Sequence, residues 1–98
     1  MHLLLNQKLE CLIEEALLSD SIQRLEKTKE DLCIATQKDF DIALETKENT
    51  KQSKQIFVRV RNREEKMKKI ESMIEKLCIV RQKLRAEIQQ KEQEIKNL

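Results

Sequence analysis

Cysteine and histidine are the side chains of this sequence with the clearest potential for chemistry, as zinc ligands or nucleophiles. The thiols are Cys11, Cys33 and Cys78, and His2 is the sole histidine. None of them has the C-x-x-C spacing of a zinc site, and a chain without glycine has no glycine-rich phosphate loop. We therefore expect a non-enzymatic protein with no catalytic, metal or cofactor site. The cysteines are expected to act as small apolar residues in a reducing compartment.

A basic stretch is the remaining candidate for recognition. Eight lysines and arginines lie between residues 51 and 69, against Glu64 and Glu65. They predict contact with an acidic protein surface such as tubulin, and a solvated helix face is the plainer interpretation. Nucleic acid is the other alternative, but Asn62 alone does not supply base reading, and no aromatic residues are interleaved for stacking. The eight residues are Lys51, Lys54, Arg59, Arg61, Arg63, Lys66, Lys68 and Lys69.

These residues must be positioned by helices, because the chain has no Gly or Pro and 39% of its residues are charged. In residues 67–98 an alternating spacing of three and four residues marks the stripe typical of a coiled coil. Labelling Met67 as heptad position a puts mostly β-branched residues at a and mostly leucine at d, a pattern that favours parallel pairs. The predicted seam is Met67, Ile70, Ile74, Leu77, Arg81, Leu84, Ile88, Lys91, Ile95 and Leu98.

Charges on this seam argue against pairing with an identical chain. In a parallel homodimer Arg81 and Lys91 would each face their own copy, and Glu87 would flank Glu92. Like charges in these places cost stability. The sequence therefore predicts a hetero-oligomer with other coiled-coil proteins that present Glu, Asp, Asn or Gln opposite Arg81 and Lys91.

The first half of the chain follows the same heptad frame less regularly. Apolar residues recur every seven positions, while the companion row three residues later is polar at Gln7, Glu14, Ser21 and Thr28. Ser19-Asp20-Ser21 is a plausible capping box, although we expect the helix to continue through it. The recurring row is Leu4, Cys11, Leu18, Leu25 and Leu32, and the expected seam continues through Asp39 and Ile42.

Residues 45–55 contain no apolar side chain. They divide the chain into an acidic amphipathic segment, residues 1–44, and a basic segment leading into regular heptads, residues 56–98. We predict an all-α fold, a long and mostly continuous helix forming a coiled coil. The alternative is an antiparallel helical hairpin bending near residues 45–55. It would place the first half, with net charge −5 over residues 1–49, against the second, with net charge +7 over residues 50–98.

The start of the chain lacks the cationic region of a secretory signal, and no apolar run approaches the ~20 residues needed to span a bilayer. In its general character the sequence looks like the coiled-coil rods of cytoskeletal assemblies, such as those of axonemes, centrosomes or kinetochores. We therefore expect a structural scaffold in the cytoplasm, associated with microtubules in a cilium, centrosome or similar structure. The alternative is a nucleic-acid or chromatin-associated coiled-coil protein in the nucleus that uses residues 51–69.

Overall fold

The computed structural model describes residues 2–45 and 50–98, and nearly all of these are helical. Helix α1 spans His2–Glu45 and helix α2 spans Thr50–Lys96. The predicted all-α fold is confirmed. Helix α1 runs without a break through Ser19-Asp20-Ser21, because nothing there removes a backbone donor or forces a left-handed residue.

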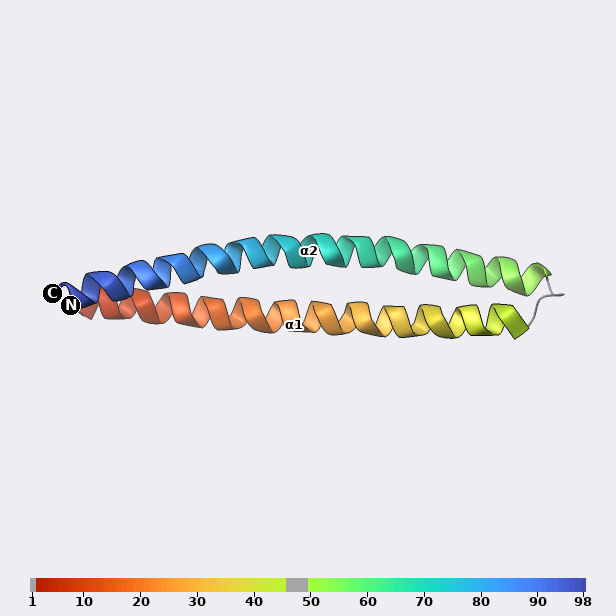
Figure 1. Ribbon diagram of the computed structural model, residues 1–98, viewed down its shortest axis with the longest axis horizontal. Coiled ribbons are helices and arrows are strands. Elements are labelled where there is room, and N and C mark those ends of the chain that lie inside the picture. Colours follow the sequence, from red (N-terminus) through yellow and green to blue (C-terminus); the bar gives the residue numbers. More distant parts are fainter. Residues whose placement is uncertain (1, 46–49) are drawn as a thin grey trace. The chain divides into compact units, whose positions relative to one another are not determined.

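Contacts between the helices divide the chain into two units. The terminal unit joins Met1–Arg24 to Ile74–Leu98, and the central unit is Leu25–Met73. Within each unit a segment of α1 lies beside a segment of α2 and runs in the opposite direction (Figure 1). The structure has the antiparallel hairpin, which the sequence analysis gave as the alternative to the preferred long, mostly continuous helix.

The end of α1 and the start of α2 both fall inside the polar stretch 45–55. Helix α1 ends at Glu45 and helix α2 begins at Thr50, so residues 51–55 are the start of α2. Asn49, which by residue type could cap a second helix, lies outside the described residues. A stretch with no apolar side chain has little to bury against a partner helix, so packing does not favour continuing one helix through it.

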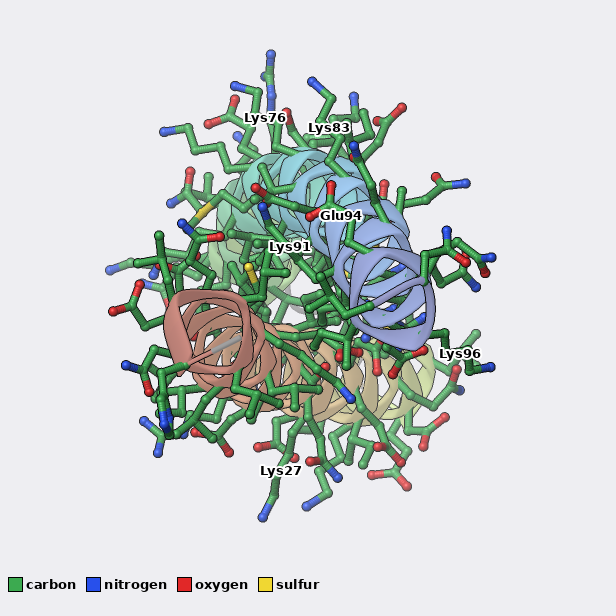
Figure 2. The ribbon with its side chains drawn as sticks, turned by 90° about the vertical axis from the view of Figure 1, so that its left-hand side faces the viewer. Lys27, Lys76, Lys83, Lys91, Glu94 and Lys96 are labelled. Atoms are coloured by element: carbon green, nitrogen blue, oxygen red, sulfur yellow. The ribbon has the colours of Figure 1, made fainter. Side chains whose placement is uncertain are left out.

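In the terminal unit the core lies between the two helical segments. Cys11 and Ile22 of α1 and Ile88 of α2 are buried, and Leu18, Leu77 and other seam residues are half-buried. Lysines on the outer side of α2 point away from α1, as Figure 2 shows for Lys76 and Lys83. Each helix therefore turns one stripe inward and a charged face to solvent.

In the central unit the core is built from both helices as well. Ile56, with 2% of its surface exposed, and Val60 are buried on α2, and Leu32 of α1 and Met67 of α2 are half-buried. Asp39 of α1 is buried among them. Within the apolar run 56–60, Ile56 and Val60 lie one helical turn apart and complete the stripe that α1 covers, whereas Phe57 and Val58 are exposed.

The inward row of α1 differs in one respect from the sequence prediction. The residues that share the inward face with the apolar row lie four positions after each apolar residue, not three as expected. Ser21, Thr28 and Ile42 of the expected row are exposed. A stripe can be completed on either side of an apolar row, and here Lys8, Glu15 and Lys29 of the later row each pair with α2. The observed row is Lys8, Glu15, Ile22, Lys29, Thr36 and Ala43, all buried or half-buried.

The hairpin predicts which side chains can be joined chemically. A carbodiimide links amines to carboxylates in contact, so it should join Lys8 to Glu92 and Lys29 to Glu71, whose charged atoms are 3.4 and 3.0 Å apart. Mixing ¹⁴N and ¹⁵N chains before the reaction separates linkage within one chain from linkage between chains. For the Lys8–Glu92 and Lys29–Glu71 linkages, mass spectrometry should find only unmixed pairs, whereas mixed-isotope pairs at these two linkages would show that the arms belong to different molecules.

Candidate functional site

Cross-arm ion pairs set the register in the terminal unit. Lys8 pairs with Glu92, and Glu15 accepts a hydrogen bond from Arg85 at 2.7 Å. Seven residues forward along α1 thus correspond to seven residues back along α2. The Arg81 guanidinium, four residues further back from Arg85, reaches the hydroxyl of Ser19 at 3.5 Å.

Asp39 organises the central unit. The residue is only 6% exposed, its carboxylate accepts a hydrogen bond from the guanidinium of Arg63, and the guanidinium of Arg59 lies 3.4 Å from its other oxygen. A buried carboxylate is tolerable only when paired, and two arginines one helical turn apart supply that pairing. Lys29 and Glu71 make a second cross-arm pair at 3.0 Å. In both units the partner's residue number falls as the α1 number rises.

The predicted seam residues within α2 lie on its inward side. Nine are buried or half-buried, and Leu98 at the end of the chain is exposed. Two of them, Met67 and Ile70, belong to the central unit and the rest to the terminal unit. They face the chain's own α1, a neighbour that the sequence prediction assigned to another protein.

The two charges on this seam find partners within the chain. Arg81 contacts Ser19 and the sulfur of Cys78, and Lys91 lies 4.0 Å from Glu94. The residue opposite Arg81 is thus a small hydroxyl side chain rather than the predicted acid or amide. Half-burial lets both long side chains cover apolar surface with their methylene groups while their charged ends reach polar atoms.

The eight basic residues of the predicted recognition stretch divide into two groups. Arg63 is turned inward to Asp39, and Arg59 also reaches Asp39 while more than half of its side chain stays exposed. The other six point to solvent from α2 of the central unit: Lys51, Lys54, Arg61, Lys66, Lys68 and Lys69. The stretch therefore contributes to the chain's own packing as well as presenting an exposed basic surface.

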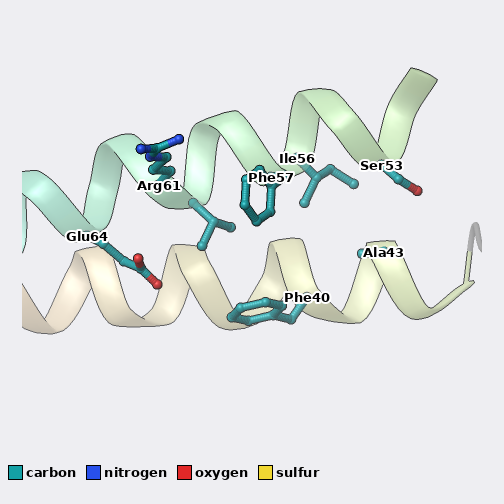
Figure 3. Close-up of a pocket in the computed structure, with 8 residues that line it drawn as sticks. Phe40, Ala43, Ser53, Ile56, Phe57, Arg61 and Glu64 are labelled. Carbon is teal, nitrogen blue, oxygen red and sulfur yellow. The ribbon is translucent and has the colours of Figure 1, made fainter. Parts of the chain in front are cut away.

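A pocket in the central unit was not predicted from the sequence. It encloses about 330 Å³ and is lined by Phe40 and Ala43 of α1 and by Ile56, Phe57 and Val60 of α2, with Ser53, Arg61 and Glu64 beside them. Figure 3 shows Phe40 and Phe57 on facing arms. These are the chain's two aromatic residues, and both are largely exposed. Their rarity was the signal in the sequence, but only the hairpin brings them together. We name this site the aromatic pocket.

The surroundings of Cys11 make its thiol less acidic. Burial raises the pKa of the Cys11 thiol, the negative charges of Glu87 and Glu14 raise it further, and a hydrogen bond to Glu87 adds to the effect against a smaller opposing influence of Lys91. A thiol kept protonated in this way is a poor nucleophile. All three cysteines are free, and Cys33 is exposed.

Among the described residues no three His, Cys, Asp or Glu side chains gather as they would around a metal ion. Neither helix, in the residues described, combines the length and apolarity that a bilayer crossing requires. No protein-family model, curated protein or solved structure matches this chain. The function must therefore be inferred from the surfaces themselves.

Replacing Asp39 should destabilise the fold. Asp39→Asn removes the charge that holds two arginines and leaves Arg63 half-buried without its partner, which should lower the free energy of unfolding by about 2 kcal/mol. Urea unfolding followed by circular dichroism measures the loss. Asp41→Asn, two residues away with an exposed carboxylate that accepts a hydrogen bond from Gln37, is the control. An equal loss in both variants would show that the buried pairs do not stabilise the hairpin.

The thiols should react with iodoacetamide in the order of their exposure. Cys33 is expected first, Cys78 second and Cys11 last, because the raised pKa and burial of Cys11 reduce its reactive thiolate at pH 8. Peptide mass spectrometry over a time course gives the three rates, and the same reaction in urea is the control, where the rates should converge. Fast labelling of Cys11 in the folded protein would contradict the buried position.

Proposed function

We propose that this chain is a non-enzymatic scaffold whose helical hairpin packs against other helical chains in a larger assembly. The observation that carries the proposal is the amount of apolar surface left outside the hairpin. Each unit contains two helical segments, and two helices can cover only the stripe between them. Large apolar side chains on the other faces then need a further partner.

In the terminal unit these side chains lie mainly on α1. Leu9 is 56% exposed and Leu17 is 63% exposed. Leu17 and Val80 line a shallow hollow of about 380 Å³ between the arms, with Leu18 and Leu84 at its base. A hollow of this composition suits one apolar side chain from a helix laid along the two arms.

In the central unit the aromatic pocket is the corresponding site. Phe57 is 67% exposed although it is one of the largest apolar side chains in the chain. The pocket is open to solvent on one side and apolar at its centre, with Arg61 and Glu64 at its edge. Aromatic side chains in such a setting are common anchors of protein interfaces. We infer that a partner helix inserts an apolar side chain between Phe40 and Phe57.

Two further features support a hetero-oligomeric assembly. The seam residues of α2 are already covered by α1, so partners must use the outer faces. Those faces differ: one is leucine-rich, and the other combines two aromatic rings with nearby basic side chains. Different surfaces suit different partners.

The exposed basic residues of α2 extend the proposal to acidic surfaces. Side chains such as Lys66, Lys68 and Lys69 point to solvent, where they can attract an acidic protein such as tubulin. This contact would place the scaffold in the cytoplasm on a microtubule-based structure such as a cilium, centrosome or kinetochore. The free thiols are compatible with that reducing compartment.

Cross-linking in native extract tests the proposal. With an amine-reactive cross-linker, Lys51 and Lys54 should be joined to a helical region of another protein, and Lys66, Lys68 or Lys69 to acidic segments of tubulin. Phe57→Ser should reduce the cross-links from Lys51 and Lys54 severalfold, because it removes one wall of the aromatic pocket without disturbing the core. Val58→Ser is the matched control, an exposed apolar neighbour outside the pocket.

Two results would overturn the proposal. One is the recovery of no helical partner by the wild-type chain. The other is tight DNA binding that weakens steeply with salt, which would favour the nucleic-acid alternative, since phosphate contacts release counterions. Equal loss of cross-links in Phe57→Ser and Val58→Ser would remove the aromatic pocket from the interface.

A further inference from the structure

A second apolar stripe runs along α1 in the terminal unit. Leu5, Leu9, Leu12 and Ala16 are all exposed and recur at spacings of four, three and four residues. This is the spacing of a helix–helix seam. We name these four residues the outer stripe. It lies on a different face of α1 from Leu4, Cys11 and Leu18, because the two sets are separated around the helix by Lys8 and Glu15.

We infer that the outer stripe binds the outer stripe of a second copy of this chain, with the two α1 helices antiparallel and related by a two-fold axis. The inference rests on the proposed function, because it assigns an occupant to one of the outer faces. An antiparallel alignment that centres on Leu9 and Leu12 sets Leu9 against Leu12 of the second copy. It also sets Leu5 against Ala16 of the second copy, a large side chain against a small one, so the two surfaces interdigitate.

Charge complementarity selects this orientation. In antiparallel helices, residues on the same flank of the seam face each other. Lys8 and Glu15 share one flank of the outer stripe, so Lys8 of each copy lies beside Glu15 of the other. In a parallel pair, the flank with Lys8 and Glu15 would instead face the other flank of the second copy. That other flank carries Ile13 and Asp20. Glu15 would then face Asp20 of the second copy, and the two carboxylates would repel each other.

The structure already holds both flanking charges in place. Lys8 lies 3.4 Å from Glu92, and Glu15 lies 2.7 Å from Arg85. Association would therefore create a row of alternating charges: Glu92 and Lys8 of one copy, then Glu15 and Arg85 of the other. Networks of this kind contribute more than isolated surface pairs, and side chains that are already ordered lose less entropy on binding.

The surface beside the stripe leaves room for the second copy. A hollow of about 370 Å³ lies next to Leu5 and is bordered by Lys8, Glu92, Ile95 and Lys96. The charges that argue against self-pairing in the sequence do not oppose this contact, because Arg81 and Lys91 lie on the seam with the chain's own α1.

Sedimentation equilibrium of the purified full chain tests the inference. The wild type should form a dimer at micromolar concentration. Leu9→Glu places a charge at the centre of the stripe and should raise the dissociation constant roughly tenfold or more. Ile79→Glu, an equally exposed apolar position on α2 in the same unit, is the control and should dimerise as the wild type does. Circular dichroism confirms that each variant keeps its helices.

A mixing experiment tests the orientation, and circular dichroism must show that each variant keeps its helices, because Lys8 and Glu15 also pair with α2 of their own chain. Lys8→Glu puts two acidic residues on the flank, and Glu15→Lys puts two basic residues there. Each variant alone should be largely monomeric, whereas an equimolar mixture should restore dimers, because every antiparallel contact is then acid against base. A mixture that stays monomeric would overturn the antiparallel arrangement.

A wild-type chain that remains monomeric would overturn the inference itself. If that monomer still cross-links to other helical proteins in extract, the proposed function stands and the outer stripe belongs to a different helix. If it neither dimerises nor acquires partners, both fail. Binding of the monomer to anionic lipid vesicles, lost in Leu9→Glu, would assign the stripe to a membrane surface instead.

Discussion

Pairing of charges along the seam is the interaction on which the rest of this structure depends. The inward stripe of α1 includes Lys8, Glu15, Lys29 and Asp39, which would be costly to desolvate alone. Each is matched by a residue of opposite charge on α2, in most cases at or just beside the edge of the seam. Apolar contacts hold the arms together but tolerate sliding by a helical turn. The charges do not, because a shift would separate every pair at once.

This constraint explains what the sequence could and could not reveal. The α2 stripe was visible because Ile70, Ile74, Leu77 and their neighbours keep a strict heptad spacing. The inward row of α1 was placed one residue too early, since Glu15 and Lys29 look like surface residues until their partners are known. The all-α class followed from the missing Gly and Pro. The hairpin was only the alternative, because a stretch without apolar side chains such as 45–55 suits an exposed helix as well as a bend, and the opposite charges of the two halves suited two separate chains equally well.

The same reasoning applies to the candidate sites. The basic stretch was recognised from composition, yet composition could not show that Arg63 turns inward to a buried carboxylate. The aromatic pocket required two residues seventeen positions apart to meet across the arms. Leu5, Leu9 and Leu12 belong to a first segment with many apolar residues, and the division of that segment into an inward and an outward stripe needed the position of α2. A site formed by two helices can be predicted only when the register between them is known.

The opposed numbering of the two arms has a consequence for how such a sequence can change over generations. One inserted residue within either arm would rotate everything beyond it by about 100° and carry the apolar stripe away from its neighbour. Residues added between Glu45 and Thr50 would leave both stripes intact. Lengthening either arm requires a matching change in the other, in steps near seven. Homologues of different length should therefore differ mainly between the two helices, or by a heptad gained or lost in both arms together. The hairpin thus restricts where insertions and deletions are tolerated.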